Sequence, residues 1–215
     1  MSTDRVRVRD FIRSFYRDPS SDILNTIEKE AEADQVPVIR KDSRELLRVL
    51  LHMKKPERIL EVGTAVGFSS VFMSTYTPES TGITTIENWP PRIEAARINI
   101  EKAGCSDRIT LLEGDAAEIL PTLEGPYDFI FMDAAKGQYI HFLPEVMRLL
   151  APEGILLSDN VLQDGDIFES RYGIVRRNHT IHSRMREYLY ALTHMEELDT
   201  VILEVGDGMS VSVRK

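Results

Sequence analysis

The chain has 215 residues, with 26 basic and 35 acidic side chains, a net charge of −9 and a single cysteine. This length favours one globular domain with a sizeable core, and one cysteine excludes an internal disulfide. A secreted scaffold held by disulfides is therefore excluded, and we expect a cytoplasmic protein. No run approaches the ~18 apolar residues of a membrane helix, and the first residues lack the apolar core of a signal peptide. We expect no membrane partner.

Ten of the 26 basic residues gather in two segments, 4–17 and 170–186. The first segment also contains two acids, whereas the second contains none. Two local basic patches on an acidic protein favour a polyanionic ligand, although solvated helix faces would give the same pattern. The arginines are Arg5, Arg7, Arg9, Arg13 and Arg17 in the first segment, and Arg171, Arg176, Arg177, Arg184 and Arg186 in the second.

The predicted elements begin with helices. Residues 9–33 are expected to be helical with a break at Asp18-Pro19, and residues 42–53 follow with Asp42 or Ser43 as the N-cap. Short β-rich runs then alternate with helical stretches. Strands are expected at 58–62, 82–86, 108–112, 127–132, 154–158 and 200–205, with helices at about 67–76, 90–103, 116–121, 138–150 and 178–193.

This alternation predicts an α/β fold with a mostly parallel sheet and helices on both faces. The turn signal Gly206-Asp207-Gly208 predicts that 209–215 forms an antiparallel last strand. We expect a single domain over 1–215, with 1–53 as an N-terminal helical extension packed on it. Ligands of such sheets bind outside the carboxyl ends of the strands, so the strand ends contain the candidate site residues.

The first three strand ends indicate an adenosine-containing cofactor. A glycine-containing turn, Gly63 to Gly67, follows the first strand and allows a ligand to approach the backbone. Glu87 ends the second strand, where an acid accepts the ribose hydroxyls in doubly wound folds, and Asp115 follows the third. The alternative is that Glu87 and Asp115 only cap the helices that follow them.

The fourth and fifth strand ends indicate a metal site. Asp133 follows the fourth strand, and Asp159 and Asn160 follow the fifth. Two carboxylates and an amide are hard oxygen ligands for Mg²⁺. Lys136 would lie beside that cation, which favours the neutral amine and lets it act as a general base. Each piece alone has a simpler explanation, a helix cap for Asp133 and a turn for Asp159-Asn160.

Taken together, the runs ILEVGTAVGFSS, GDA, FIFMDAAKGQY and LLSDNV resemble the cation-dependent S-adenosylmethionine O-methyltransferases, which include the catechol and caffeoyl-CoA enzymes. The resemblance covers about residues 36–215. The DAAKGQY, DNVL and VGDG runs are most similar to the bacterial branch that methylates 5-hydroxyuridine at the tRNA wobble position. The resemblance implies a Rossmann-like seven-stranded methyltransferase sheet, a homodimer, and S-adenosylmethionine and Mg²⁺ as cofactors.

The resemblance also implies residue roles. The cofactor would contact Ile39, Glu61, Gly63, Thr64, Ser69, Glu87, Asp115, Ala116 and Asp133. The metal ligands would be Asp133, Asp159 and Asn160, and the catalytic base would be Lys136.

Two substrates fit this chemistry, because 5-hydroxyuracil and catechol both offer two adjacent oxygens to a metal. A wobble base lies in a single-stranded anticodon loop, whose phosphates would need basic side chains such as Arg176 and Arg177. Small catechol-like or CoA-linked phenols are the alternative. A nicotinamide oxidoreductase is disfavoured because the glycine spacing is not G-x-G-x-x-G, and a non-catalytic adenosine-binding or RNA-binding module is a further alternative. Trp89, which follows Glu87 closely, is a candidate to flank the adenine ring.

Overall fold

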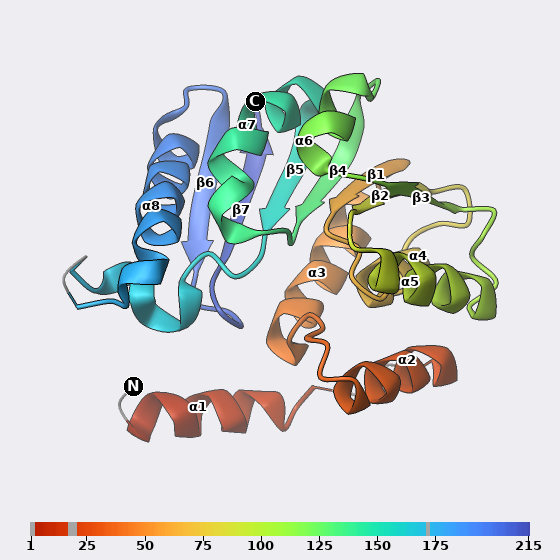
Figure 1. Ribbon diagram of the computed structural model, residues 1–215, viewed down its shortest axis with the longest axis horizontal. Coiled ribbons are helices and arrows are strands. Elements are labelled where there is room, and N and C mark those ends of the chain that lie inside the picture. Colours follow the sequence, from red (N-terminus) through yellow and green to blue (C-terminus); the bar gives the residue numbers. More distant parts are fainter. Residues whose placement is uncertain (1–2, 17–20, 171–172) are drawn as a thin grey trace.

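Seven strands form one sheet in the order β3-β2-β1-β4-β5-β7-β6 in the computed structural model, which describes residues 3–16, 21–170 and 173–215 (Figure 1). β1 to β5 run parallel, and β7 lies between β5 and β6, antiparallel to both. The predicted fold class and the antiparallel last strand are confirmed. The strands are β1 (Arg58–Val62), β2 (Gly82–Glu87), β3 (Ile109–Glu113), β4 (Tyr127–Met132), β5 (Leu150–Ser158), β6 (Leu198–Leu203) and β7 (Met209–Arg214).

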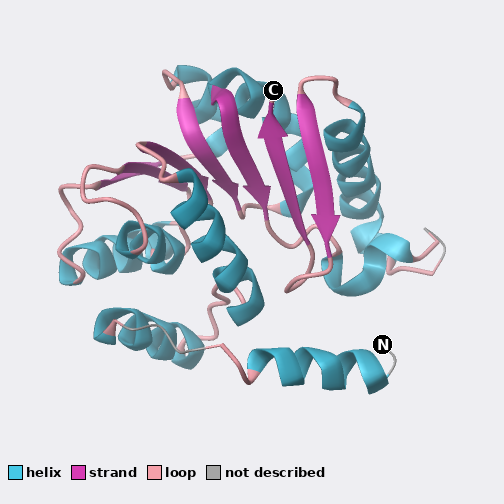
Figure 2. Ribbon diagram, turned by 180° about the vertical axis from the view of Figure 1, so that it is seen from behind, coloured by secondary structure: helices cyan, strands magenta, loops and turns pink. Residues whose placement is uncertain are grey.

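Helices lie on both sides of the sheet (Figure 2). The α-helices are α1 (Thr3–Arg13), α2 (Asp22–Ala33), α3 (Lys41–Lys54), α4 (Phe68–Thr75), α5 (Pro90–Lys102), α6 (Ala116–Ile119), α7 (Tyr139–Leu149) and α8 (His179–His194). Short 3₁₀ helices are η1 (Leu120–Thr122), η2 (Lys136–Gln138), η3 (Gln163–Phe168) and η4 (Arg176–Asn178).

Two hydrophobic cores form because alternate residues of a strand point to opposite faces of the sheet. In β4, Phe129 and Phe131 pack with α2, α3 and α4 on one face. Ile130 and Met132 pack with α7 and α8 on the other face. Strands that are apolar on both faces are typical of a parallel sheet covered by helices, as the sequence predicts.

The predicted N-cap of α3 is wrong. The helix begins one residue earlier, with Arg40 in extended backbone at the cap position and no side-chain cap bond. Asp42 instead accepts hydrogen bonds from both Nε and Nη2 of Arg13 of α1, with Nη2 2.8 Å from Oδ2. The next side chain, Ser43, reaches Asp159 at the carboxyl edge of the sheet. Tertiary partners therefore take both side chains that could have capped the helix. The predicted break at Asp18-Pro19 lies outside the described residues.

No helix among the described residues is long and apolar enough to cross a membrane. The topology brings the carboxyl ends of β1, β4 and β5 to one edge of the sheet. The N-terminal end of α3 and the loop of residues 206–208 meet at the same edge, where Arg40 donates to the Gly206 carbonyl. This edge contains the candidate site.

Candidate active site

Asp133 and Asp159 lie next to each other at the ends of neighbouring strands. The Asp133 amide donates to the Val62 carbonyl and the Asp159 amide to the Met132 carbonyl, each at 3.0 Å, so both residues prolong the parallel ladder by one step. The hydroxyl of Tyr139 donates to the carbonyls of Met132 and Asp159 at 3.1 Å and ties the two strand ends together. The spacing in the sequence therefore becomes a pair of carboxyls at one point of the edge.

Burial and neighbouring charges make both carboxyls hard to ionise. Burial, followed by the negative charge of Glu61, raises the pKa of Asp133 to about 6, although Lys136 opposes the shift. Burial and the charge of Asp133 raise the pKa of Asp159 to about 7. Negative charge that is concentrated and poorly solvated in this way is what a bound divalent cation would stabilise.

Asn160 adopts left-handed backbone with a φ of 61° directly after Asp159. The backbone amide of Asn160 donates to Asp159 Oδ1 at 2.8 Å, while Ser43 Oγ lies 3.4 Å from the same oxygen. The amides of Val161 and Leu162 then donate to the carbonyls of residues 208 and 207, which anchors the chain to the C-terminal loop. These bonds fix the direction in which the chain leaves β5.

Lys136 forms an ion pair with Asp207, whose Oδ2 lies 3.3 Å from Nζ. Asp207 is buried, and its charge also contributes to the raised pKa of Asp159. Gly208 holds the loop in place, because it has a φ of 83° and a Cβ there would lie 2.1 Å from Leu162. The amine is thus held at the edge that carries Asp133 and Asp159.

A cavity of about 490 Å³ opens beside the Asp133–Asp159 pair, between the carboxyl ends of β1 to β4. Five of the predicted cofactor residues line it: Gly63, Glu87, Asp115, Ala116 and Asp133. The other four do not line it. Thr64 and Ser69 are buried beside the turn, Glu61 is buried in β1, and Ile39 packs into the core next to α3.

Glu61 is completely buried, and only one of its carboxylate oxygens is used. Ser70 and Thr85 both donate to Oε2, and the Ser69 hydroxyl also lies close enough to lower the pKa of the carboxyl, whereas no hydrogen bond to Oε1 forms among the described residues. Burial raises the pKa of this carboxyl above its ordinary value. An unused buried acceptor next to the turn that lines the cavity fits the ammonium group of an amino-acid ligand.

Gly63 shows why the turn after β1 needs glycine. Its φ is 104°, and a Cβ at this position would lie 2.1 Å from the Asp133 carbonyl oxygen. Any side chain would push β1 and β4 apart at the mouth of the cavity. The glycine therefore lets the two strand ends approach each other and leaves the backbone open to a ligand.

The simpler interpretation, a helix cap, is confirmed for Asp115 but is wrong for Glu87, because α5 has Trp89 at its N-cap and no side-chain cap bond. The Glu87 carboxylate accepts the amides of Ala65 at 2.8 Å and of Asn88 and Trp89 at 3.0 Å. Asp115 caps α6 by accepting the amide of Ala117 at 2.9 Å. Because both residues also line the cavity, these backbone contacts and a ligand-binding role are compatible.

The basic segment 170–186 follows η3 and leads into α8. Arg176 and Arg177 are exposed in η4. Arg184 of α8 donates to the Gly137 carbonyl at 3.2 Å, directly after Lys136, so the segment is tied to the loop that carries the candidate base. Arg171 lies outside the described residues, as does Arg17 of the N-terminal group.

Sequence reasoning missed three polar residues at the site: Ser43, Tyr139 and Asp207. Asp207 had a signal, the VGDG run that contains it, but that run was interpreted as a turn and as part of the resemblance, and no role was given to Asp207. Ser43 and Tyr139 had none, because nothing local shows that their hydroxyls reach Asp159. In the part of the chain that the structure describes, no three His, Cys, Asp or Glu side chains form a metal cluster, and the predicted ligand set has two carboxylates and one amide.

Residues 17–215 match a family described as O-methyltransferase. A catechol O-methyltransferase of Niastella koreensis is 33% identical over 127 residues, which are 57% of this chain and 58% of that protein. A catechol O-methyltransferase of Mycobacterium tuberculosis is 31% identical over 140 residues, 64% of each chain. The chain thus spans about three fifths of the length of these two curated relatives.

A solved structure has the same fold over nearly the whole chain. The SAH-bound methyltransferase of Podospora anserina superposes with a TM-score of 0.86 and 26% identity, covering 100% of this chain and 97% of that one.

Proposed function

Because this chain belongs to the S-adenosylmethionine-dependent O-methyltransferase family, we propose that it transfers the methyl group of S-adenosylmethionine to a hydroxyl whose neighbouring carbon bears a second oxygen. The observation that carries this proposal is the juxtaposition of Asp133, Asp159 and Lys136 beside the 490 Å³ cavity.

The cofactor site fits the two ends of S-adenosylmethionine. Glu61 Oε1 and the open backbone at Gly63 would receive the amino-acid part. Glu87 would accept the ribose hydroxyls, and Asp115 and Ala116 would meet the adenine. Asp133 faces both the cavity and Asp159, so it would lie between the cofactor and the metal.

The residues present fit Mg²⁺. Asp133, Asp159 and Asn160 would hold it, and its charge would relieve the repulsion that raises the pKa of Asp159. When bound, the cation supplies positive charge that binds two adjacent oxygens and favours loss of the hydroxyl proton. Lys136 would have to be neutral beside the cation to accept that proton at Nζ, and Asp207, 3.3 Å away, would then hold the resulting ammonium in place.

The proposed substrate is 5-hydroxyuridine at the tRNA wobble position, converted to 5-methoxyuridine. Its support is the acid-free segment at the site, in which Arg176 and Arg177 are exposed and Arg184 contacts the Lys136 loop. Exposed arginines in a segment that contacts the Lys136 loop suit the phosphates around a splayed base, and a small neutral phenol does not need them. This reaction requires a protein that works in the cytoplasm.

Small catechol-like or CoA-linked phenols are the second candidate. The names of the two relatives above favour them. The active-site chemistry is the same, so only the surroundings of the metal site distinguish the two substrates.

The deciding experiment is mass spectrometry of tRNA nucleosides from a strain that lacks this protein. Accumulation of 5-hydroxyuridine with loss of 5-methoxyuridine would support the tRNA substrate. Unchanged 5-methoxyuridine, together with methylation of catechol by the purified protein, would support the phenol alternative.

A homodimer is also part of the proposal. Val201 of β6 and Val213 of β7 lie on one face of the sheet and are 49% and 38% exposed. Val49 and Met53 of α3 are exposed too, and Figure 2 shows this end of the sheet open beside α3. A second copy of the chain would cover these apolar side chains.

A further inference from the structure

Arg92 lies in the first turn of α5 and lines the cofactor cavity, together with Glu87 and residues 114–117. It follows Glu87 by five residues, and its amide donates to the Trp89 carbonyl at 2.9 Å. Neither the metal chemistry nor the proposed cofactor contacts use this side chain.

The guanidinium of Arg92 has a buried donor without an acceptor. Its Nε is shielded from solvent, and no acceptor among the described residues lies within hydrogen-bond distance. A charged side chain is normally paired, and Arg92 forms no ion pair among the described residues although its side chain lines the cavity, so a ligand in the cavity is the partner available to the guanidinium.

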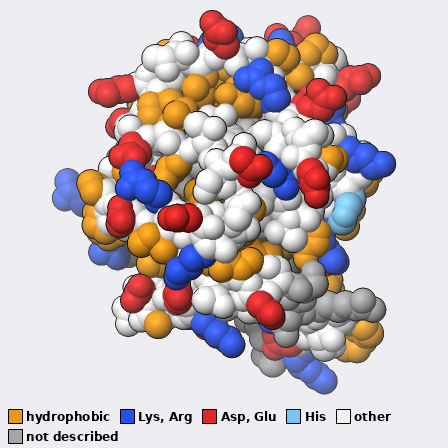
Figure 3. Space-filling view, turned by 90° about the vertical axis from the view of Figure 1, so that its right-hand side faces the viewer, with side chains coloured by type: hydrophobic (Ala, Val, Ile, Leu, Met, Phe, Trp, Pro, Cys, Tyr) orange, Lys and Arg blue, Asp and Glu red, His pale blue; other side chains and the backbone are white. Residues whose placement is uncertain are grey.

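Glu87, an acid that lines the same cavity as Arg92, already binds three backbone amides. Glu87 uses its carboxylate for the amides of Ala65, Asn88 and Trp89 and forms no ion pair with Arg92. Arg97, one and a half turns further along α5, shows the contrast, because it pairs with Glu94 and Glu113. On the side of the molecule that carries α4 and α5, acidic and basic side chains are interspersed (Figure 3).

Trp89 supports the guanidinium from one side. The Arg92 guanidinium carbon lies 5.1 Å from the centre of the Trp89 ring. Trp89 is 52% exposed and does not line the cavity, whereas Arg92 does. The indole therefore holds the planar group against the cavity and does not itself reach the space between Glu87 and Asp115.

We propose that Arg92 is a cofactor-binding residue that holds the adenosine part of S-adenosylmethionine: its guanidinium, backed by Trp89, covers the nucleoside and donates a hydrogen bond to it. A planar guanidinium suits a purine ring or a ribose oxygen, since it stacks on flat groups and donates in a fixed direction. This inference rests on the cofactor site of the proposed function.

The test is binding of S-adenosylhomocysteine, measured by calorimetry without any substrate. Arg92→Ala should weaken binding roughly 10- to 100-fold, the range expected for a lost hydrogen bond to a charged donor. Arg92→Met, which keeps the aliphatic stem, should lose nearly as much. Binding of 5′-methylthioadenosine, which lacks the amino-acid part, should fall by the same factor, because the contact is with the nucleoside.

Trp89 provides a second readout, because it is the only tryptophan of the chain. Adding S-adenosylhomocysteine to the wild type should change its fluorescence, since the ligand contacts the guanidinium stacked on it. Arg97→Ala is the matched control on the same helix and should bind like the wild type.

Two outcomes would overturn the inference in distinguishable ways. If Arg92→Ala and Arg92→Met bind within twofold of the wild type, Arg92 is not a binding residue, although the proposed function stands. If the wild type itself does not bind S-adenosylhomocysteine, the proposed function and this inference fail together.

Discussion

The carboxyl group of Glu61 lies in the middle of the sheet with one oxygen unused. Its pKa is raised above the ordinary value by burial, so the native state keeps a proton that the unfolded chain releases near pH 4 to 5. Stability from this group is therefore fully present at low pH and is lost as pH rises toward the native pKa. A ligand's ammonium group would compensate this cost when it binds.

We predict that Glu61→Gln stabilises the cofactor-free protein at pH 8 and has a much smaller effect near pH 4. The amide keeps an oxygen for Ser70 and Thr85 and removes the buried charge. Thermal unfolding at both pH values measures the effect, with the exposed Glu94→Gln as the control. A variant less stable than the wild type at pH 8 would mean that the carboxylate has a partner after all.

Asp159 is expected to be essential for the metal and dispensable for the cofactor. Asp159→Ala and EDTA should each abolish methyl transfer, and added Mg²⁺ should restore only the EDTA-treated wild type. Binding of S-adenosylhomocysteine should survive the substitution, because Asp159 does not line the cofactor cavity. Asp199→Ala, at an exposed aspartate of β6, is the control. Full activity in EDTA would refute the metal mechanism.

Lys136→Met should lower turnover by ~10²-fold or more at neutral pH, because it removes the base and keeps the side-chain length. The loss should shrink as pH approaches the substrate's own hydroxyl pKa, where the deprotonated substrate needs no base. A pH series of turnover measures this trend, with Lys102→Met on the outer end of α5 as the control. A loss that is independent of pH would show that the Lys136–Asp207 pair only holds the loop.

Among the elements, η4 and α8 carry the prediction that separates the two substrates. Arg176→Glu combined with Arg177→Glu should abolish tRNA methylation, since each lost phosphate contact lowers the salt slope of log binding by ~0.7 for a single strand. Methylation of a small catechol, which carries no phosphate, should change little. Parallel assays with both substrates measure the difference.

The control for this pair is Lys29→Glu with Lys102→Glu, which makes the same charge change on α2 and α5. Equal loss for tRNA and catechol would mean that the segment shapes the metal site, as the Arg184 contact to Gly137 would allow. If methylation of neither substrate falls, η4 is a solvated surface that does not bind the substrate.

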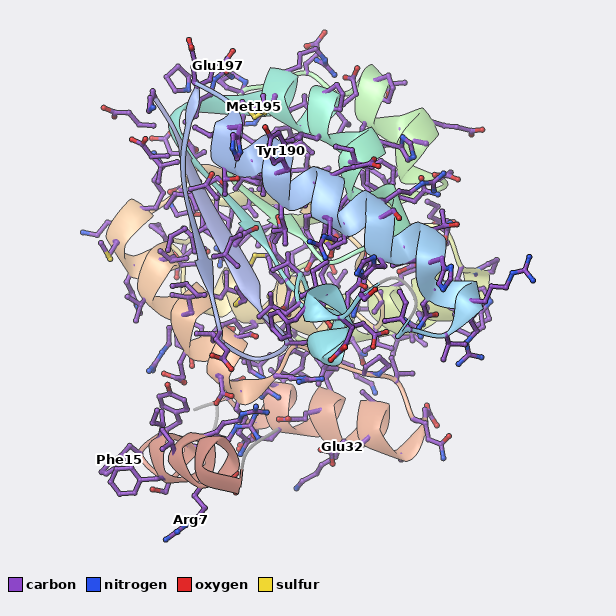
Figure 4. All side chains as sticks on the ribbon, turned by 90° about the vertical axis from the view of Figure 1, so that its left-hand side faces the viewer. Arg7, Phe15, Glu32, Tyr190, Met195 and Glu197 are labelled. Carbon is purple, nitrogen blue, oxygen red and sulfur yellow. The ribbon has the colours of Figure 1, made fainter. Side chains whose placement is uncertain are left out.

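At the scale of the whole molecule, exposed apolar side chains occur at several places among the described residues, and two groups of them are candidates for an interface. One is the face of β6 and β7 next to α3. The other is the α1 segment, where Phe11 and Phe15 are 65% and 69% exposed and Phe15 and Arg7 project away from the rest of the protein (Figure 4). In a dimer with a two-fold axis, one of these surfaces can contact the other surface of the second copy, and the symmetry then forms the same contact twice.

We predict a solution mass twice that of the 24.5 kDa chain by light scattering. Val201→Glu should shift the mass toward the monomer, because it places a charge in the middle of the uncovered sheet face. Ile98→Glu, at an exposed position on α5, should leave the mass unchanged. A monomeric wild type would contradict the homodimer.

The elements that sequence reasoning located best are the buried strands and the amphipathic helices. β1 and β4 have the predicted bounds. The start of α1 lies six residues before the predicted residue 9 and the start of β5 four residues before the predicted residue 154, and most other ends differ by one or two residues. Strand and helix periodicity is local, so a single chain segment contains the whole signal. The start of α3 was wrong for the opposite reason, since Asp42 and Ser43 are used by partners 29 and 116 residues away.

The sequence by itself determined the alternation of strands and helices, the glycine turn at Gly63 and the acids at the strand ends, because each of these depends on neighbours along the chain. Only the tertiary structure decided which of those acids meet, that Lys136 pairs with Asp207, and that Arg92 lines the cavity. These contacts join segments far apart in the chain, and the order of the strands in the sheet, not their order in the sequence, brings them together.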